Sequence, residues 1–404
     1  MNLFSMTTRR DPYPLYDQLR ATSPVLHVPG PDLWVVFGYD AVKRALSDHE
    51  AFSSDVGPSR GNSFQWLLFM DPPRHTKLRA IISRAFTPRS IAALEPRIRE
   101  LTRGLVDQIA GGIAGGIVDR AGDRSLDRGE FDLVADLATP LPMMVIAELL
   151  GLPIDDWRQF AGWSEAIVNL GNTIAGGDAQ LASAEFMRAD AEMTEYLGRV
   201  IAARRTHAAD DLISRLATAE VDGERLDDRE ITRFCQLLLA AGTETTTNLI
   251  DNVMLCFVAH PDQLARVRTD PALLAPAIEE VLRYRTPVQA MFRATTREVE
   301  LEGTKIPAGK FVVAMIGSAN RDPRKFADPA RFDVTREPNP HVAFGHGIHF
   351  CLGAPLSRLE ASIALGELLG RFTHFELASP DWPPRTSFHV HGPAELRLRC
   401  QRTA

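Results

Sequence analysis

The sequence predicts a mainly α-helical fold with a minor β region, formed by a single domain over residues 1–404 whose first ten or so residues are disordered. Three observations support this prediction. Apolar residues recur at helical spacing along most of the chain. Residues 227–259 form the longest such stretch, and its flanks are apolar on nearly all sides, which predicts a buried central helix. No segment has the composition of a linker, although 404 residues could hold two or three domains.

The N-terminal elements follow from local patterns. A hairpin of residues 25–28 and 33–37 is predicted around Pro29-Gly30-Pro31, because Pro and Gly favour turns. Loops are predicted at 52–69, 111–128 and 170–178, where small and polar residues interrupt the periodicity. Helices are predicted at 11–22, 41–47, 91–109, 133–150, 155–168 and 182–205, and one begins near Met70.

The C-terminal part mixes helices and strands. Asp227 and Glu230 have the spacing of a capping box at the start of the central helix, and His260-Pro261 ends it. We also predict a helix at 264–285, an extended segment at 287–292, strands at 299–301 and 311–316, a helix after Cys351, and a hairpin ending near Arg399.

Composition and charge exclude several classes of protein. The formal net charge of −7 argues against nucleic-acid binding. No apolar run approaches the roughly eighteen residues of a membrane span, and residues 1–10 lack the hydrophobic core of a signal peptide, so we expect a cytoplasmic protein without a membrane anchor. The four cysteines form no Cys-x-x-Cys pair, which excludes a zinc ribbon and a thioredoxin motif.

The ten residues from Phe344 to Gly353 carry the strongest functional signal. Cys351 lies in a glycine-rich loop, and Pro355 suits the first turn of the helix that follows. A helix N-terminus favours a thiolate over a thiol, so Cys351 is a candidate soft metal ligand. The alternative is a buried structural cysteine. The pattern Phe-Gly-x-Gly-x-His-x-Cys-x-Gly resembles the haem-binding loop of the cytochrome P450 family, bacterial type. That resemblance implies haem b as cofactor, with Cys351 as the thiolate ligand of its iron.

Basic residues form a second candidate site. His75 and Arg79 are four residues apart and share one helix face; the alternative is a solvated basic pair. The pattern Asp-Pro-Pro-x-His-x-x-x-Arg resembles the P450 helix whose His and Arg bind the haem propionates. Phe292-Arg293 resembles the strand whose arginine does the same, and His349 joins the set through its place in the cysteine loop. Charge-assisted hydrogen bonds from such donors would compensate the propionates.

The centre of the long helix is unusual. Glu244 and several threonines interrupt an apolar stretch, and threonine hydroxyls can compete for backbone carbonyls. We therefore predict a local widening or kink; the alternative is a polar stripe facing solvent. The run Ala241-Gly242-Thr243-Glu244-Thr245 resembles the P450 central helix. The resemblance places Ala241 and Gly242 at the cofactor and makes Thr245 and Glu244 the alcohol and acid that manage protons.

Two further sets complete the candidate residues. Glu280 and Arg283 are three apart; alone they could be an ordinary surface ion pair, whereas the resemblance implies a buried structural pair. A substrate pocket is expected from positions in the loops, the central helix and the C-terminal hairpin, although the loop at 52–69 could instead be packed surface. The expected pocket residues are Phe64, Trp66, Leu67, Leu238, Val288, Met291 and Phe388.

The resemblance spans about residues 10–400 and rests on five motifs in order. It implies the P450 fold, with haem between the 227–259 helix and the helix after Cys351. It also implies a monomeric monooxygenase of secondary metabolism that inserts one atom of O2 into a small apolar organic substrate, with electrons from a ferredoxin and an NAD(P)H-dependent reductase. Two alternatives are a peroxide-driven haem-thiolate peroxygenase and a non-catalytic haem-thiolate binding protein. Activity with peroxide but not with reductant and O2 would indicate the first, and absence of turnover with any redox partner the second.

Overall fold

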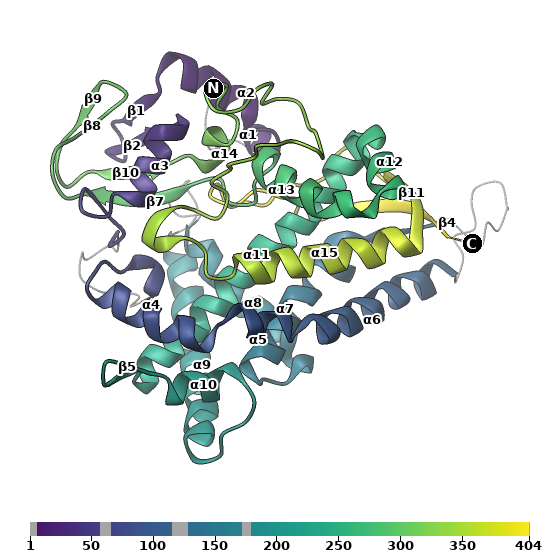
Figure 1. The fold of residues 1–404 in the computed structure, drawn as a ribbon, viewed down its shortest axis with the longest axis horizontal. Coiled ribbons are helices and arrows are strands. Elements are labelled where there is room, and N and C mark those ends of the chain that lie inside the picture. Colours follow the sequence, from purple (N-terminus) through teal and green to yellow (C-terminus); the bar gives the residue numbers. More distant parts are fainter. Residues whose placement is uncertain (1–5, 57–65, 115–127, 172–178, 404) are drawn as a thin grey trace.

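The computed structural model describes residues 6–56, 66–114, 128–171 and 179–403. It confirms the predicted mainly helical fold with a minor β region. Figure 1 shows the long helix α11 inside the molecule, with α15 crossing beside it and other helices packed around both.

The described helices have the following bounds: α1 Met6–Arg10, α2 Tyr13–Thr22, α3 Tyr39–Ser47, α4 Arg74–Ala85, α5 Pro88–Ala92, α6 Glu95–Ala114, α7 Pro140–Leu150, α8 Trp157–Gly171, α9 Ala179–Thr206, α10 Leu212–Thr218, α11 Asp228–Ala259, α12 Pro261–Thr269, α13 Leu274–Tyr284, α14 Ile316–Ala319 and α15 Ala354–Arg371. The strands are β1 Val25–Val28, β2 Leu33–Val36, β3 Phe52–Ser53, β4 Arg128–Asp132, β5 Glu220–Val221, β6 Glu224–Arg225, β7 Met291–Thr295, β8 Val299–Leu301, β9 Thr304–Ile306, β10 Phe311–Ala314, β11 Phe372–Leu377 and β12 Arg397–Arg402.

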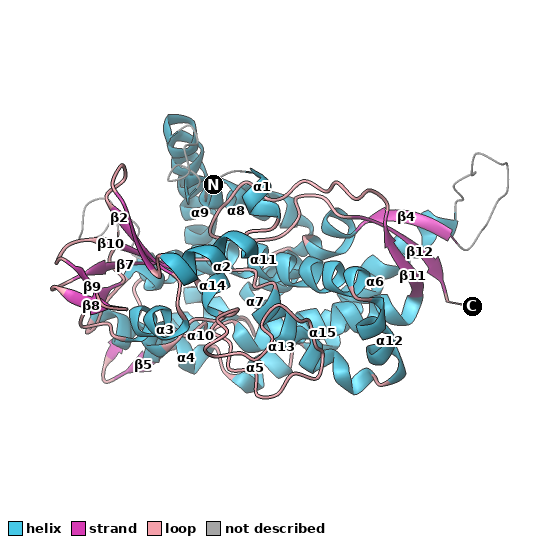
Figure 2. Ribbon diagram, turned by 90° about the horizontal axis from the view of Figure 1, so that it is seen from above, coloured by secondary structure: helices cyan, strands magenta, loops and turns pink. Residues whose placement is uncertain are grey.

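Two sheets lie at opposite ends of the helical body (Figure 2). The larger has the strand order β1-β2-β10-β7-β3, with β10 parallel to β2 and antiparallel to β7. In this register Val312 of β10 faces Arg293 of β7, which places that arginine in a buried, central strand. The smaller sheet has the order β11-β12-β4 and confirms a C-terminal hairpin, to which β4 adds a third strand.

The central helix α11 begins and ends as the sequence predicts. The Asp227 carboxylate accepts a hydrogen bond from Glu230 N at 2.7 Å, and Glu230 accepts one from Asp227 N at 3.1 Å, which completes a capping box. Its side chains contribute to the largest core cluster, which also includes α6, α7, α13 and α15. The predicted local widening is wrong, because residues 228–259 are α-helical without a break, and the alternative of a kink stays a prediction.

Other differences come from proline and from helix ends. The predicted helix 264–285 is two helices, α12 and α13, because Pro271 starts a new turn after Asp270 accepts a bond from Ala272 N. The strand predicted to Ile316 ends at Ala314, and α14 follows. Met6–Arg10 form α1 rather than a disordered tail, while residues 1–5 lie outside the described part. Most of the predicted loops 111–128 and 170–178 also lie outside it.

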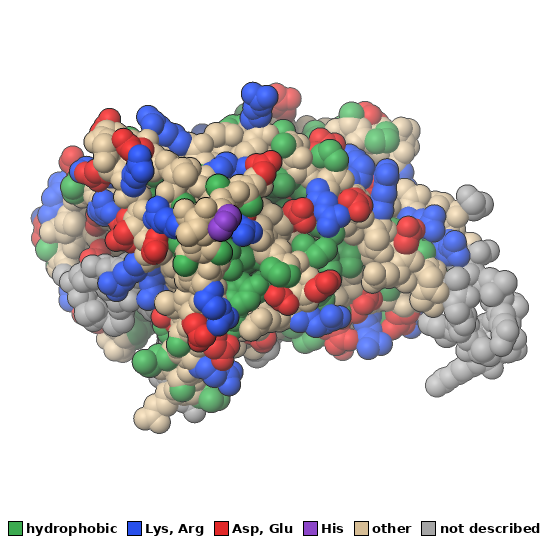
Figure 3. Space-filling model, turned by 90° about the horizontal axis from the view of Figure 1, so that it is seen from below, with side chains coloured by type: hydrophobic (Ala, Val, Ile, Leu, Met, Phe, Trp, Pro, Cys, Tyr) green, Lys and Arg blue, Asp and Glu red, His purple; other side chains and the backbone are tan. Residues whose placement is uncertain are grey.

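Within the described residues, none of the helices combines the length and apolar character needed to cross a bilayer. The face shown in Figure 3 carries Lys and Arg interspersed with Asp and Glu around a group of hydrophobic side chains. Charges of both signs are mixed over this face, so it does not form a basic surface of the kind that nucleic acids require.

Candidate active site

The cysteine loop is shaped by its glycines and closed by one backbone bond. Cys351 N donates to the Phe344 carbonyl at 2.9 Å. Gly345 and Gly347 have φ angles of 75° and 74°, a region that side chains with a Cβ rarely adopt. A Cβ at Gly347 would also lie 2.8 Å from the Cα of Ser47 in α3. The loop therefore packs closely on α3 and places Cys351 just ahead of α15. Gly353 is the N-cap residue of α15.

Opposing influences act on the Cys351 thiol. The Cys351 side chain is exposed on the open side of the loop. On its remaining sides the surrounding protein excludes bulk water, and this burial raises the thiol pKa. Backbone N–H groups of Gly353 and Ala354 and the charges of Arg79 and Arg358 lower the pKa without cancelling that rise. All four groups favour the thiolate, so the loop is arranged to hold a negatively charged sulfur once a cation binds it.

Two histidines, one beside the loop and one within it, have ring nitrogens without hydrogen-bond partners among the described residues. His75 of α4 is 1% exposed, and both of its ring nitrogens are unpaired; Nε2 of His349 is likewise buried and unpaired. The two ring centroids are 4.1 Å apart. Burial, and then nearby positive charges, lowers the pKa of His75 to about 4 and that of His349 to about 3.

Two arginines add positive charge to these histidines. Arg293 is 3% exposed, and within the described structure no carboxylate lies within ion-pair distance of it. It donates to the Phe292 carbonyl at 2.7 Å, and burial lowers its pKa to about 10 despite the opposing field of Asp71. Arg79 donates to the Phe350 carbonyl. Buried polar groups are normally paired, so this convergence of donors fits a ligand that carries carboxylates.

The candidate site residues of α11 face different neighbours. Ala241 is exposed and Thr245 is half-buried, with its hydroxyl donating to the Ala241 carbonyl at 2.7 Å. Gly242 faces α7 instead, since a Cβ there would lie 3.0 Å from Ile146. Glu244 is largely buried, and this burial raises its pKa to about 7, against the lowering effect of Arg385.

A hydroxyl pair ties the central helix to the helix that follows the cysteine loop. Thr246 of α11 donates to the Ser357 hydroxyl of α15 at 3.1 Å. The sequence neighbours of this pair are Thr245 on one helix and the Cys351 loop ahead of the other. The fold therefore fixes the candidate proton-handling residues on α11 and the candidate ligand just ahead of α15, and these two helices are bonded to each other.

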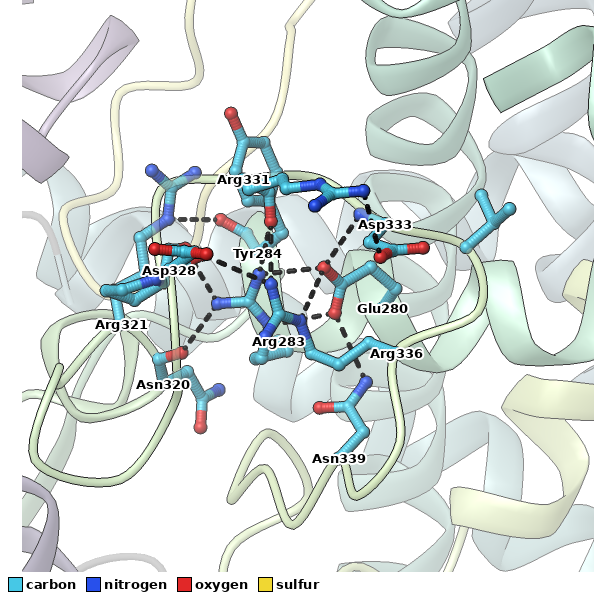
Figure 4. Close-up of polar contacts among 12 residues, drawn as sticks. Glu280, Arg283, Tyr284, Asn320, Arg321, Asp328, Arg331, Asp333, Arg336 and Asn339 are labelled. Carbon is cyan, nitrogen blue, oxygen red and sulfur yellow. Dashed lines mark hydrogen bonds and ion pairs between the residues drawn. The ribbon is translucent and has the colours of Figure 1, made fainter. Parts of the chain in front are cut away.

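Glu280 and Arg283 form a fully buried ion pair, not a surface one (Figure 4). Both Glu280 oxygens accept from Arg283 at 2.8 Å. Arg336 and Asn339 add bonds to the same carboxylate at 3.0 and 3.3 Å. Arg283 in turn donates to backbone carbonyls of Asn320, Pro329 and Arg331. The pair thus cross-links α13 to the irregular segment that leads to the cysteine loop.

Most of the expected substrate-pocket residues pack in or against different hydrophobic clusters. Phe64 lies outside the described residues. Trp66 stacks on Phe69 with centroids 6.2 Å apart. Leu67 and Leu238 pack in or against the main core, Val288 and Met291 against a second cluster, and Phe388 against a third, where it contacts Phe292. Phe388 also lines a cavity between the larger sheet and α2, and its place in the substrate pocket stays a prediction.

Sequence reasoning missed two arginines at the site. Arg358 of α15 lies 4.4 Å over the Phe344 ring and pairs with Glu279 at 2.6 Å, so it braces the cysteine loop. Its position seven residues after Cys351 was a usable signal, because two turns of helix return it to the loop. Arg385 approaches Glu244 from the C-terminal segment, and no local pattern could have indicated that contact.

Comparisons with known proteins agree with one another. The family model of cytochrome P450 matches residues 179–391. Cytochrome P450 monooxygenase PikC of Streptomyces venezuelae is 42% identical, covering 97% of this chain and 92% of that protein, and 6-deoxyerythronolide B hydroxylase of Saccharopolyspora erythraea is 37% identical, covering 96% of each. The crystal structure of CYP109E1 from Bacillus megaterium in complex with testosterone is 40% identical with a TM-score of 0.84, covering 96% of this chain and 99% of that one.

Proposed function

The chain belongs to the cytochrome P450 family, and from that premise we propose that it hydroxylates a small apolar organic substrate with electrons from a ferredoxin and an NAD(P)H-dependent reductase. Its relatives are named monooxygenases and hydroxylases, and the chain is an oxidoreductase that incorporates oxygen. Members of the family bind haem b through a cysteine thiolate. We assign the whole of residues 1–404 to one domain.

The observation that carries the proposal is the set of buried basic side chains at the cysteine loop that have no carboxylate partner. His75, Arg293 and His349 converge without a carboxylate of the described chain to pair with them. The two propionates of haem would supply that negative charge. Cys351 follows in the same loop as His349 and would be the thiolate ligand of the haem iron, so one short segment would hold both the metal and a propionate.

Haem with a thiolate ligand activates O2 for transfer of one oxygen atom. The protein's own groups would do the rest. Gly353 and Ala354 direct N–H groups at the Cys351 sulfur, which stabilises its negative charge. On α11, Glu244 would supply protons, and the Thr245 hydroxyl would pass them on. The Thr245 hydroxyl already donates its hydrogen to the Ala241 carbonyl, so the lone pairs of its oxygen can accept a hydrogen bond from a proton donor.

The substrate class is proposed from the compounds named for related proteins. The CYP109E1 structures contain testosterone and corticosterone, and PikC and 6-deoxyerythronolide B hydroxylase are relatives of comparable identity. Steroids are therefore the first compounds to test for a spin-state shift of the haem, followed by macrolides. A binding site lined by apolar residues with few polar groups suits either class.

The first experiment is the ferrous–CO difference spectrum of the purified protein. A strongly red-shifted Soret band, lost in Cys351→Ala and kept in Cys400→Ala, would support thiolate ligation by Cys351. Cys400 is a suitable control because it is buried in β12 at the far sheet. Retention of the band in Cys351→Ala would contradict the assignment. Product formation with ferredoxin, reductase and O2, and none with peroxide alone, would then separate the monooxygenase from a peroxygenase.

A further inference from the structure

A buried polar stripe on α11 extends beyond the predicted acid. Glu244, Asn248 and Asp251 are spaced four and three residues apart and therefore share one helix face. Asn248 and Asp251 have no exposed surface. Neither Asp251 oxygen has a hydrogen-bond partner, and burial raises its pKa well above the usual value. A buried polar side chain without a partner is costly, so this stripe calls for an explanation.

Among the described residues, the cation that faces the stripe is Arg385, from a distant part of the chain. Arg385 Nε donates to the Asn248 side-chain oxygen at 2.9 Å and lies 4.0 Å from a Glu244 carboxylate oxygen. Its positive charge also acts on Asp251. The other charged groups of the described residues that act on these acids are carboxylates: Glu165 of α8 acts on Glu244, and Asp132 of β4 acts on Asp251.

The C-terminal segment is shaped to bring Arg385 to this place. Arg385 N donates to the Gly392 carbonyl at 3.0 Å, and Pro384 pairs with Pro393, which closes a compact turn. A Cβ at Gly392 would collide with the side chain of Asn248. The turn therefore packs directly on α11, and the Arg385 guanidinium lies in a fixed position next to Glu244, the acid that precedes Thr245.

We propose that Arg385, held by Asn248, is the positioning residue that anchors the Glu244 carboxylate beside Thr245, and that Asp251 is the protonated acid that completes this cluster. One guanidinium can compensate one buried carboxylate, so the second acid remains neutral. Glu244, which is closer to Arg385 and partly exposed, is the acid that can give up its proton and carry the negative charge, and the fully buried Asp251 keeps its proton. The inference deepens the proposed function, because it rests on Glu244 as the proton donor of the reaction.

The test measures coupling, the product formed per NAD(P)H consumed, as a function of pH. Arg385→Gln should move the midpoint of this profile upward by roughly one to three pH units, because loss of a nearby opposite charge raises a carboxyl pKa. Arg385→Lys should return most of the shift, and Asn248→Ala should give a smaller shift in the same direction.

Arg285→Gln is the matched control. Arg285 donates to Asn252, one turn further along α11, at 3.0 Å, but no acid of the stripe is its partner. The Arg285→Gln variant should lose as much stability as Arg385→Gln without moving the midpoint of the coupling profile. An equal shift in Arg285→Gln, or none in Arg385→Gln, would overturn the positioning role.

Infrared spectra of the holoenzyme provide a readout that is independent of turnover. At neutral pH a protonated-carboxyl band should be lost in Asp251→Asn, and a second such band should grow in Arg385→Gln and vanish when Glu244→Gln is added. No loss of a band in Asp251→Asn would refute its protonated state. The Glu244→Gln variant separates the two proposals: an unchanged pH profile there defeats the relay itself, whereas an altered one with a silent Arg385→Gln defeats only the inference about Arg385.

Discussion

The buried pair Glu280–Arg283 offers a sharp test of what holds the cysteine loop in place. Arg283→Met removes both bonds to Glu280 and three bonds to backbone carbonyls, all from a site with no exposed surface. Removing one partner of a buried pair costs about 3–5 kcal/mol. Arg336 remains bonded to Glu280 at 3.0 Å and moderates the loss, whereas each orphaned carbonyl adds to it. We therefore expect a loss of about 3–5 kcal/mol in the free energy of unfolding.

Urea unfolding of the holoprotein, followed by circular dichroism and by the Soret band, measures this loss. Arg99→Met is the control: Arg99 bonds to Glu95 and Glu367 at 3.0 Å each, but its side chain is 39% exposed. Such surface pairs contribute at most about 1 kcal/mol. The double variant Glu280→Met/Arg283→Met should lose less than the sum of the single variants. A loss for Arg283→Met no larger than that for Arg99→Met would refute the reasoning.

Three further predictions concern the site and its surroundings. Thr245→Ala should lower coupling several-fold while reductant is still consumed, and Thr245→Ser should restore the coupling. Assays of product and of NAD(P)H consumption measure both effects, and full coupling in the Ala variant would count against the proton relay. Gly347→Ala should lower the free energy of unfolding by more than about 1 kcal/mol and lower the haem content, because the φ angle of Gly347 is 74° and an added Cβ would meet Ser47. The control Gly112→Ala, in open space on α6, should be neutral or stabilising. Equal thermal unfolding midpoints for the two variants would contradict this prediction. Burial raises the pKa of Glu360 to about 8, so the folded state holds a proton that the unfolded state releases above about pH 4.5. The free energy of unfolding should therefore fall by a few kcal/mol as pH rises from about 4.5 to about 8. Glu360→Gln should flatten this dependence, and unfolding measured as a function of pH would show it.

Much of the fold follows from local patterns. The capping box at Asp227 and Glu230 and the prolines at helix starts involve residues within a few positions of each other. Such interactions form wherever the chain takes those angles, so the sequence predicts their place well. The cysteine loop is of the same kind, because Gly345, Gly347 and the Cys351 backbone bond to Phe344 are set within ten residues.

What the sequence by itself determined was the helical class, the central helix and the cysteine loop ahead of a helix. Only the tertiary structure decided the contacts between distant segments: Arg385 with Asn248, 137 residues apart, and Arg283 with carbonyls up to 48 residues away. It also separated the expected pocket residues into three clusters. The physical reason is that a helix period or a turn depends on neighbours along the chain, whereas a buried charge finds its partner only when the packing of many side chains has fixed which segments meet.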